Sequence, residues 1–174
     1  MESNGSGAAF LEYDGDSRLD VFLINGSTLE GFPEGDAPMN RLFRNVGDGK
    51  FEDSTGSSGL GRSGWGSAVC AGDYDNDGRL DLFVAYWGAD SLYRNRDDGS
   101  FADSAAMAGV AEGSKQWSSG CTFVDYDRDG LLDLLVTQYQ QFDPETAPPR
   151  ARRRTANGKA CPSTAIRGGS RLAA

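Results

Sequence analysis

Short apolar runs alternate with acidic, glycine-containing segments along most of this 174-residue chain. The runs at residues 19–24, 80–84 and 132–136 each follow an acidic segment and carry apolar residues on both sides of an extended backbone. Such short, nearly continuous apolar runs are typical of β-strands that are buried on both faces. We therefore expect buried inner strands here, with residues such as Leu19 and Leu23 inside the protein.

The same four strands recur in the same order. One strand leads into the acidic segment and a second leaves it, an Arg-Asn strand follows at residues 40–45 and 90–95, and a short strand beginning with phenylalanine follows at 51–54 and 101–104. Four short strands in a period of about 50 residues predict the blade of a β-propeller. The first period is longer because of an insertion within or near residues 26–38, which we expect to be an exposed loop.

This pattern predicts an all-β fold, a partial β-propeller of about two and a half to three blades, each of four short antiparallel strands. The propeller repeats occupy residues 1–143, with blade units near 8–58, 59–108 and 109–143. Four aromatic residues are expected to pack between neighbouring blades: Phe51, Trp65, Phe101 and Trp117. A partial propeller exposes sheet edges, so further blades or other chains are needed to close the ring.

Three nine-residue acidic segments begin at residues 12, 73 and 125, with carboxylates at their first, third, fifth and ninth positions. Calcium takes roughly 6–8 oxygen ligands in flexible geometry, so alternating carboxylates on a curled backbone can converge on one ion. The predicted ligands are Glu12, Asp14, Asp16 and Asp20 in loop 1; Asp73, Asp75, Asp77, Asp81 and the carbonyl of Arg79 in loop 2; and Asp125, Asp127, Asp129, Asp133 and the carbonyl of Leu131 in loop 3.

The sixth position distinguishes the three loops. Gly78 and Gly130 permit a sharp turn there, whereas loop 1 has Ser17. We therefore expect two calcium sites, in loops 2 and 3, and a weaker or missing site in loop 1. The loops are not EF-hands, because their twelfth position is Val84 or Val136 instead of glutamate and a strand follows. The alternative interpretation is an Asp-rich turn that is held by Asx hydrogen bonds and binds no metal.

The chain resembles the FG-GAP/VCBS repeats of integrin α-subunit propellers and of many bacterial surface and secreted proteins. The resemblance is carried jointly by the acidic loops, the Arg-Asn strands and the Gly-Asp-Gly turn at residues 47–49. The closer resemblance, in residues 40–60, 64–88 and 116–145, is to the cartilage acidic protein and ASPIC/UnbV group. The resemblance implies a calcium-binding propeller that serves as an extracellular interaction scaffold. The chain departs from that group in having fewer than the usual blades, about seven, and in lacking an ASPIC/UnbV domain.

Charge is unevenly distributed along the chain. The net charge is −9, but residues 144–174 carry seven Lys or Arg and one Glu, so the remainder carries −15. The acidic body is a poor candidate for binding nucleic acid, which needs a basic face. Residues 144–174 are expected to be a disordered basic tail, with binding to nucleic acid or an anionic surface as the alternative. A frame-shifted or truncated gene is our hypothesis for the abrupt change.

The chain contains no histidine, which excludes Ser-His-Asp and Cys-His catalytic sets and histidine-based zinc sites. Its cysteines, Cys70, Cys121 and Cys161, form no CxxC pair. Cys70 and Cys121 lie one place out of register on equivalent strands, so we expect them to face opposite sides. We predict that both are buried free thiols, with a disulfide as the alternative.

The expected function is a non-catalytic, calcium-binding scaffold for protein interaction at the cell surface or in secreted form. No apolar run is long enough to cross a membrane, no signal peptide is visible, and an extracellular or periplasmic location is implied by the resemblance alone. The partner, whether protein or carbohydrate, is not identified by the sequence. The alternatives are a fragment of a propeller-hosted enzyme and a truncated gene product without independent function. Equal carboxylate spacing in three copies argues against catalysis, because a catalytic site is normally built once.

Overall fold

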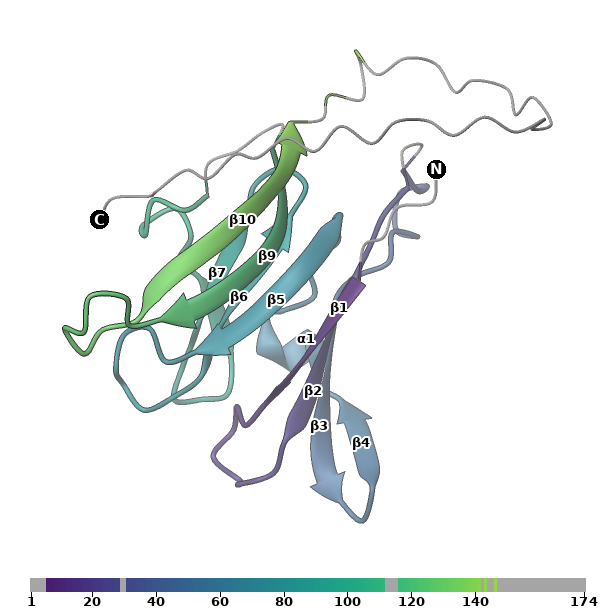
Figure 1. Ribbon diagram of the computed structural model, residues 1–174. Helices are drawn as coiled ribbons and strands as arrows, with labels where there is room; N and C mark the ends of the chain where they lie inside the picture. The colour runs from purple at the N-terminus through teal and green to yellow at the C-terminus, as the bar shows by residue number, and fades with distance from the viewer. Residues whose placement is uncertain (1–5, 29–30, 112–115, 142, 144–145, 147–174) are drawn as a thin grey trace, which may run out of the picture.

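The computed structural model describes residues 6–28, 31–111, 116–141, 143 and 146. They form three antiparallel sheets that lie side by side (Figure 1). The predicted all-β fold is confirmed: successive sheets stack as the blades of a partial propeller that does not close into a ring. Most of the predicted tail at 144–174 lies outside the described residues.

Blade 1 and blade 2 are four-stranded, and the described residues of blade 3 form two strands. Neighbouring strands of each blade are consecutive in the chain. Their bounds are β1 (Ser6–Leu11), β2 (Asp20–Asn25), β3 (Arg41–Gly47) and β4 (Lys50–Asp53) in blade 1; β5 (Gly66–Gly72), β6 (Asp81–Tyr86), β7 (Ser91–Asn95) and β8 (Phe101–Asp103) in blade 2; and β9 (Gln116–Val124) and β10 (Asp133–Gln141) in blade 3.

A short helix that the sequence did not reveal, α1 (Thr55–Ser58), follows the last strand of blade 1. It ends at Gly59, and the small residues of this segment lead the chain towards blade 2. The described residues of the predicted insertion at 26–38 form turns and irregular structure between β2 and β3, and most of them are exposed. No helix in the described part of the chain is long and apolar enough to span a membrane.

The apolar core consists of two layers, each between two neighbouring blades. The layer between blades 1 and 2 contains Leu11, Tyr13, Phe22, Ile24, Leu42, Leu60, Leu82, Val84, Tyr86, Tyr93 and Phe101. The layer between blades 2 and 3 contains Phe83, Ala85, Leu92 and Ala105, with Cys121, Phe123, Leu134 and Val136 packed against them. The strand β6 contributes to both layers, and all six of its residues are buried.

Blade 1 corrects the expectation that every inner strand is covered on both faces. Leu19 and Leu23 are 59% and 38% exposed, and Phe51 is 46% exposed. These side chains lie on the face of blade 1 that points away from blade 2, where the described chain supplies no further blade. Trp65 and Phe101 are buried as predicted, and Trp117 is half-buried against Trp65.

The two described cysteines lie in contact, which the sequence did not reveal. Cys70 belongs to β5 of blade 2 and Cys121 to β9 of blade 3, and both pack in the layer between these blades. As expected, they point to opposite faces of equivalent strands. Successive blades pack with opposite faces in contact, so the two side chains meet in the layer between blades 2 and 3. Both are free, half-buried thiols. A hydrogen bond with Cys70, together with desolvation, raises the pKa of Cys121.

The stacking predicts a large effect for Leu82, which is fully buried between blades 1 and 2. Leu82→Ala should lower the free energy of unfolding by about 2–5 kcal/mol, because it removes apolar contacts and leaves a cavity. Met107→Ala is the control, since Met107 is 88% exposed, and it should change stability by less than about 0.5 kcal/mol. Urea denaturation followed by circular dichroism measures both; equal effects would contradict the stacked arrangement.

Candidate metal centres

The three acidic loops lie at the same end of their blades, each between the first and second strand (Figure 1). In every loop the carboxylates at the first, third and ninth positions converge, with one oxygen from each lying within 4.8 Å of the others. These triads are Glu12, Asp14 and Asp20; Asp73, Asp75 and Asp81; and Asp125, Asp127 and Asp133. They are the candidate metal centres of the protein, and nine of the twelve predicted carboxylate ligands belong to them.

The ninth carboxylate begins the second strand of each blade and ties the loop to it. In blade 2, Asp81 accepts hydrogen bonds from the backbone N–H of Tyr74 at 3.2 Å and of Asn95 at 2.8 Å. Asp20 makes the same two bonds in blade 1, with Tyr13 and Asn45. Each of these buried aspartates therefore holds the start of its loop and the Arg-Asn strand in one arrangement.

The first carboxylate closes the loop from the other side. Asp73 accepts the backbone N–H groups of Asp77 at 3.0 Å and Gly78 at 2.8 Å. Asp125 accepts the equivalent pair in loop 3, from Asp129 and Gly130. A carboxylate oxygen has two lone pairs, so these bonds leave capacity for a cation.

The fifth carboxylate behaves differently from the other three. Asp77 accepts the backbone N–H of Arg79 at 3.0 Å, and Asp129 accepts that of Leu131 at 2.8 Å. Asp16 makes the same local bond with Arg18. These are the Asx-type hydrogen bonds of the metal-free interpretation, and they coexist with the converging triads. Ligation by the fifth carboxylates, and by the carbonyls of Arg79 and Leu131, stays a prediction.

Arginine side chains partly neutralise loops 1 and 2. Arg44 pairs with Asp14 at 2.5 Å, and Arg94 pairs with Asp75 at 2.5 Å and with Asp77 at 3.2 Å. Partial desolvation raises the pKa of Asp77, but the N–H and charge of Arg79 and the bond from Arg94 outweigh it and hold the pKa below its usual value. Among the described residues, loop 3 has no such ion pair.

In loops 1 and 2, one buried oxygen of the third carboxylate lacks a protein partner within the described part of the chain. Asp14 Oδ1 and Asp75 Oδ1 have no hydrogen-bond partner among the described residues. A buried carboxylate oxygen without a partner is costly, and a coordinated cation would remove this cost. An all-oxygen donor set of three carboxylates suits a hard divalent cation, so the residues present fit calcium.

Burial ranks the loops differently from the glycine pattern. Asp20 and Asp81 are fully buried, whereas Asp133 is exposed. Enclosure therefore favours loops 1 and 2, while a glycine at the sixth position favours loops 2 and 3. Loop 2 combines both properties.

The backbone at the sixth position confirms that the turn needs a positive φ. Gly78 and Gly130 have φ values of +86° and +87°, and Ser17 has +64°. A serine in this left-handed region is strained by its Cβ, which a glycine avoids.

Burial of Asp81 has an electrostatic consequence. Desolvation raises the pKa of Asp81 to about 6, and the negative charges of Asp75 and Asp77 add to the effect. The pKa of Asp20 is raised for the same leading reason. Both triads of the metal-free protein thus hold a proton more readily than an exposed aspartate does, and a bound cation would favour the charged form.

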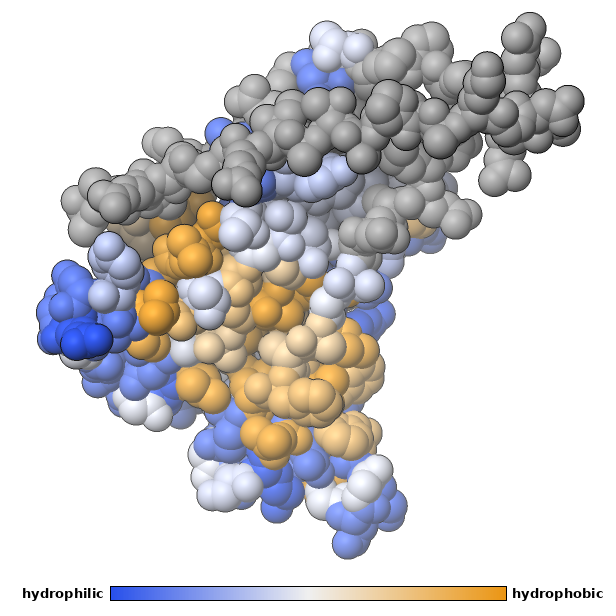
Figure 2. Space-filling view, viewed as in Figure 1, coloured by the Kyte–Doolittle hydropathy of each residue, from blue (hydrophilic) through white to orange (hydrophobic). Residues whose placement is uncertain are grey.

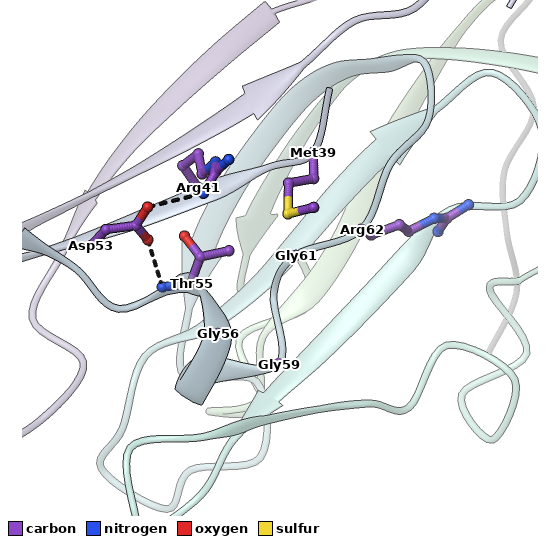
Figure 3. A pocket seen from close by; sticks show the side chains of 8 residues that line it. All are labelled: Met39, Arg41, Asp53, Thr55, Gly56, Gly59, Gly61 and Arg62. Atoms are coloured by element: carbon purple, nitrogen blue, oxygen red, sulfur yellow. Dashed lines mark hydrogen bonds and ion pairs between the residues drawn. The ribbon is translucent and has the colours of Figure 1, made fainter. Parts of the chain in front are cut away.

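A shallow hollow on blade 1 is separate from these centres. Figure 3 shows the residues that line it, among them Met39, Arg41, Asp53, Thr55 and Arg62. Arg41 pairs with Asp53 at 2.9 Å, and Asp53 also accepts the backbone N–H of Thr55 at 2.9 Å. Arg62, by contrast, donates to Ser91 and to the carbonyl of Ala89, which are not among the lining residues, and the hollow contains no member of a triad.

Sequence reasoning missed the roles of the Arg-Asn strands. Arg44 and Arg94 reach the third carboxylates, and the side-chain amide of Asn95 donates to the carbonyls of Leu80 at 3.3 Å and Tyr13 at 3.0 Å. The bond to Tyr13 joins blade 2 to loop 1. The recurrence of the Arg-Asn pair at the same place in the first two units was the available signal.

A family profile described as an FG-GAP-like repeat matches the chain twice, over residues 12–84 and 73–136. Each match begins at the first carboxylate of an acidic loop and ends in the strand after the next loop. Together the matches cover more than half of the chain. No curated protein matches it significantly.

Replacing Ser17 with glycine should relieve the strain in loop 1. We expect Ser17→Gly to raise the free energy of unfolding by about 0.5–1 kcal/mol, the balance between the relieved left-handed strain and the greater freedom of glycine when unfolded. The reverse change, Gly78→Ser, is the matched control and should lower stability by a similar amount. Thermal unfolding in EDTA measures both, and a destabilised Ser17→Gly variant would be inconsistent with this account.

The raised pKa of Asp81 predicts a pH-dependent stability of the metal-free protein. The ordinary pKa of an aspartate, which applies to the unfolded chain, is 3.8. Between pH 4 and 6 the folded protein therefore binds more protons at Asp81 than the unfolded chain does. The contribution of Asp81 to stability therefore falls as pH rises through this window. The melting temperature of wild type in EDTA, minus that of Asp81→Asn, should decrease from pH 4 to 6.5. A difference that stays constant would show that Asp81 titrates normally.

Proposed function

The chain belongs to the FG-GAP-like repeat family, and on this basis we propose that it is a calcium-binding, propeller-type interaction scaffold. The observation that carries the proposal is the convergence of three carboxylates in each of three equivalent loops. Two of these sites contain a buried carboxylate oxygen without a partner among the described residues, Asp14 Oδ1 and Asp75 Oδ1. Both features are expected of a site that is completed by a cation.

The chemistry of the triads favours calcium over zinc, and their size is compatible with calcium. Calcium–oxygen distances are about 2.3–2.6 Å, so two ligand oxygens on opposite sides of the ion lie about 4.6–5.2 Å apart. The triad oxygens lie within 4.8 Å of one another, which suits this sphere. Zinc prefers nitrogen and sulfur ligands, and the chain has no histidine and no cysteine in any triad.

When bound, calcium would neutralise the clustered carboxylates and join the loop to the strands around it. Asp75 and Asp81 would hold the ion together with Asp73, while Arg94 would continue to compensate Asp77. Because Asp81 also bonds Tyr74 and Asn95, ion binding should stabilise the whole blade. Calcium would therefore act on structure, and the proposed role is scaffolding.

Several finer aspects of this function are also proposals. By resemblance, the chain would belong with the cartilage acidic protein and ASPIC/UnbV group and would act outside the cytoplasm. Its partner would be a protein or a carbohydrate. We do not favour an enzymatic role, because the same carboxylate arrangement is built three times.

Calcium titration tests the proposal directly. Isothermal calorimetry of the chelator-treated protein should show binding at the triads, and calcium at about 100 times Kd should stabilise the fold by about 2.7 kcal/mol per site. This corresponds to a rise of roughly 5–10 °C in melting temperature for one site. Asp75→Asn should remove one site from the stoichiometry.

The matched control for Asp75→Asn is Asp36→Asn, which makes the same charge change at an exposed position between β2 and β3. It should leave the number of sites unchanged. An equal melting temperature in EDTA and in excess calcium, with no heat of binding, would overturn the proposal. So would the loss of a site in the control.

A further inference from the structure

Within the described part of the chain, the apolar faces at the two ends of the stack of blades have no neighbouring blade. The front face of blade 1, which points away from blade 2, presents Phe10, Leu19, Leu23 and Phe51, which are 67%, 59%, 38% and 46% exposed. The rear face of blade 3, which points away from blade 2, presents Val124, Tyr126 and Leu135, which are 44%, 77% and 55% exposed. Figure 2 shows apolar residues gathered over the strands and hydrophilic residues at the loop ends.

The residues of the front face have buried counterparts one blade further along. Aligning the acidic loops and strand pairings places Leu23 at the position of Val84, and Phe51 at the position of Phe101. Val84 is fully buried and Phe101 is 6% exposed, because blade 1 packs against that face of blade 2. The front face of blade 1 is thus a surface of the kind that buries itself against the rear of a preceding blade.

The rear face of blade 3 has the complementary counterparts. Val124 corresponds to Leu11 and Leu135 to Phe22, both of which are fully buried where the rear of blade 1 meets blade 2. Tyr126 corresponds to Tyr13, which is 8% exposed. One molecule therefore carries both halves of an interface that it already forms internally.

From this repetition we propose that copies of this chain associate head to tail, with the rear face of blade 3 of one copy packed on the front face of blade 1 of the next. The occupant of each open face is thus a second copy of the same chain. The faces are made of apolar side chains outside the triads, so this inference does not depend on calcium binding.

The residues that make specific contacts in the internal interface have equivalents on the two exposed faces. Tyr13 lies against the ring of Phe101, with ring centroids 6.1 Å apart, and its carbonyl accepts the side-chain amide of Asn95. The counterparts are Tyr126 on the rear face, and Phe51 and Asn45 on blade 1. The side-chain amide of Asn45 donates to the carbonyl of Leu19 at 3.1 Å, as that of Asn95 does to the carbonyl of Leu80. The docked copy would add the stacking of Tyr126 on Phe51 and the bond from Asn45 to the Tyr126 carbonyl.

This interface joins two different faces, so it is heterologous. Repetition of a heterologous contact closes into a ring if the rotation between copies permits and otherwise extends as a filament. Either arrangement also covers the apolar surface that a single copy exposes.

Two complementary variants test the proposal. Phe10→Asp places a charge on the front face, and Leu135→Asp places one on the rear face; each should weaken self-association of the full chain more than about tenfold in sedimentation velocity. Both side chains are exposed within one copy, so the fold should persist, which circular dichroism verifies. Met107→Asp is the control, since Met107 is exposed outside both faces, and it should associate like wild type.

Mixing the two variants is the decisive measurement. Phe10→Asp keeps an intact rear face and Leu135→Asp keeps an intact front face, so the mixture should form a complex of one copy of each and stop there. A monomeric wild type would overturn the proposal, as would continued self-association of either variant alone, which would indicate pairing of like faces or use of another surface. A mixture that stays monomeric would overturn it as well.

Discussion

The structure depends on a buried aspartate at the start of the second strand of each complete blade. Asp81 is fully buried and yet accepts hydrogen bonds from the acidic loop and from the Arg-Asn strand. Asp20 does the same in blade 1. A single carboxylate thus fixes the acidic loop, the second strand and the Arg-Asn strand relative to one another. Its negative charge adds to that of the other carboxylates in the loop, and this charge must be compensated.

Compensation of that charge links architecture to ion binding. Carboxylate oxygens in a triad lie within 4.8 Å of one another, and two unit charges at that separation repel by roughly 3 kcal/mol or more at an effective dielectric constant of about 20. Arg44 and Arg94 reduce this repulsion from the side of the third strand, but they leave Asp14 Oδ1 and Asp75 Oδ1 without a partner among the described residues. The arginines and a cation therefore have different tasks: the arginines orient the third and fifth carboxylates, and the cation would occupy the space between the first, third and ninth.

Stacking of identical units explains both the core and the open surfaces. Blade 2 buries one face against blade 1 and the other against blade 3, so its strand β6 is covered completely. The same amphipathic design at the ends exposes Phe10 and Leu135. The contact of Cys70 with Cys121 has the same origin, because opposite faces of successive blades form one layer.

Periodicity alone was enough to predict the all-β fold, the four-strand unit and the acidic loops, because strand alternation and loop spacing are local properties of the chain. The convergence of the first, third and ninth carboxylates followed from the same spacing. Three features depended on how the units stack. The exposure of Leu19, Leu23 and Phe51 depends on whether a neighbouring blade is present, which no local pattern records. The reach of Arg44 and Arg94 into the loops depends on strand pairing across distant residues. The meeting of Cys70 and Cys121 depends on front-to-rear packing, since a single strand shows which face a side chain takes but only the assembled sheets show what that face touches.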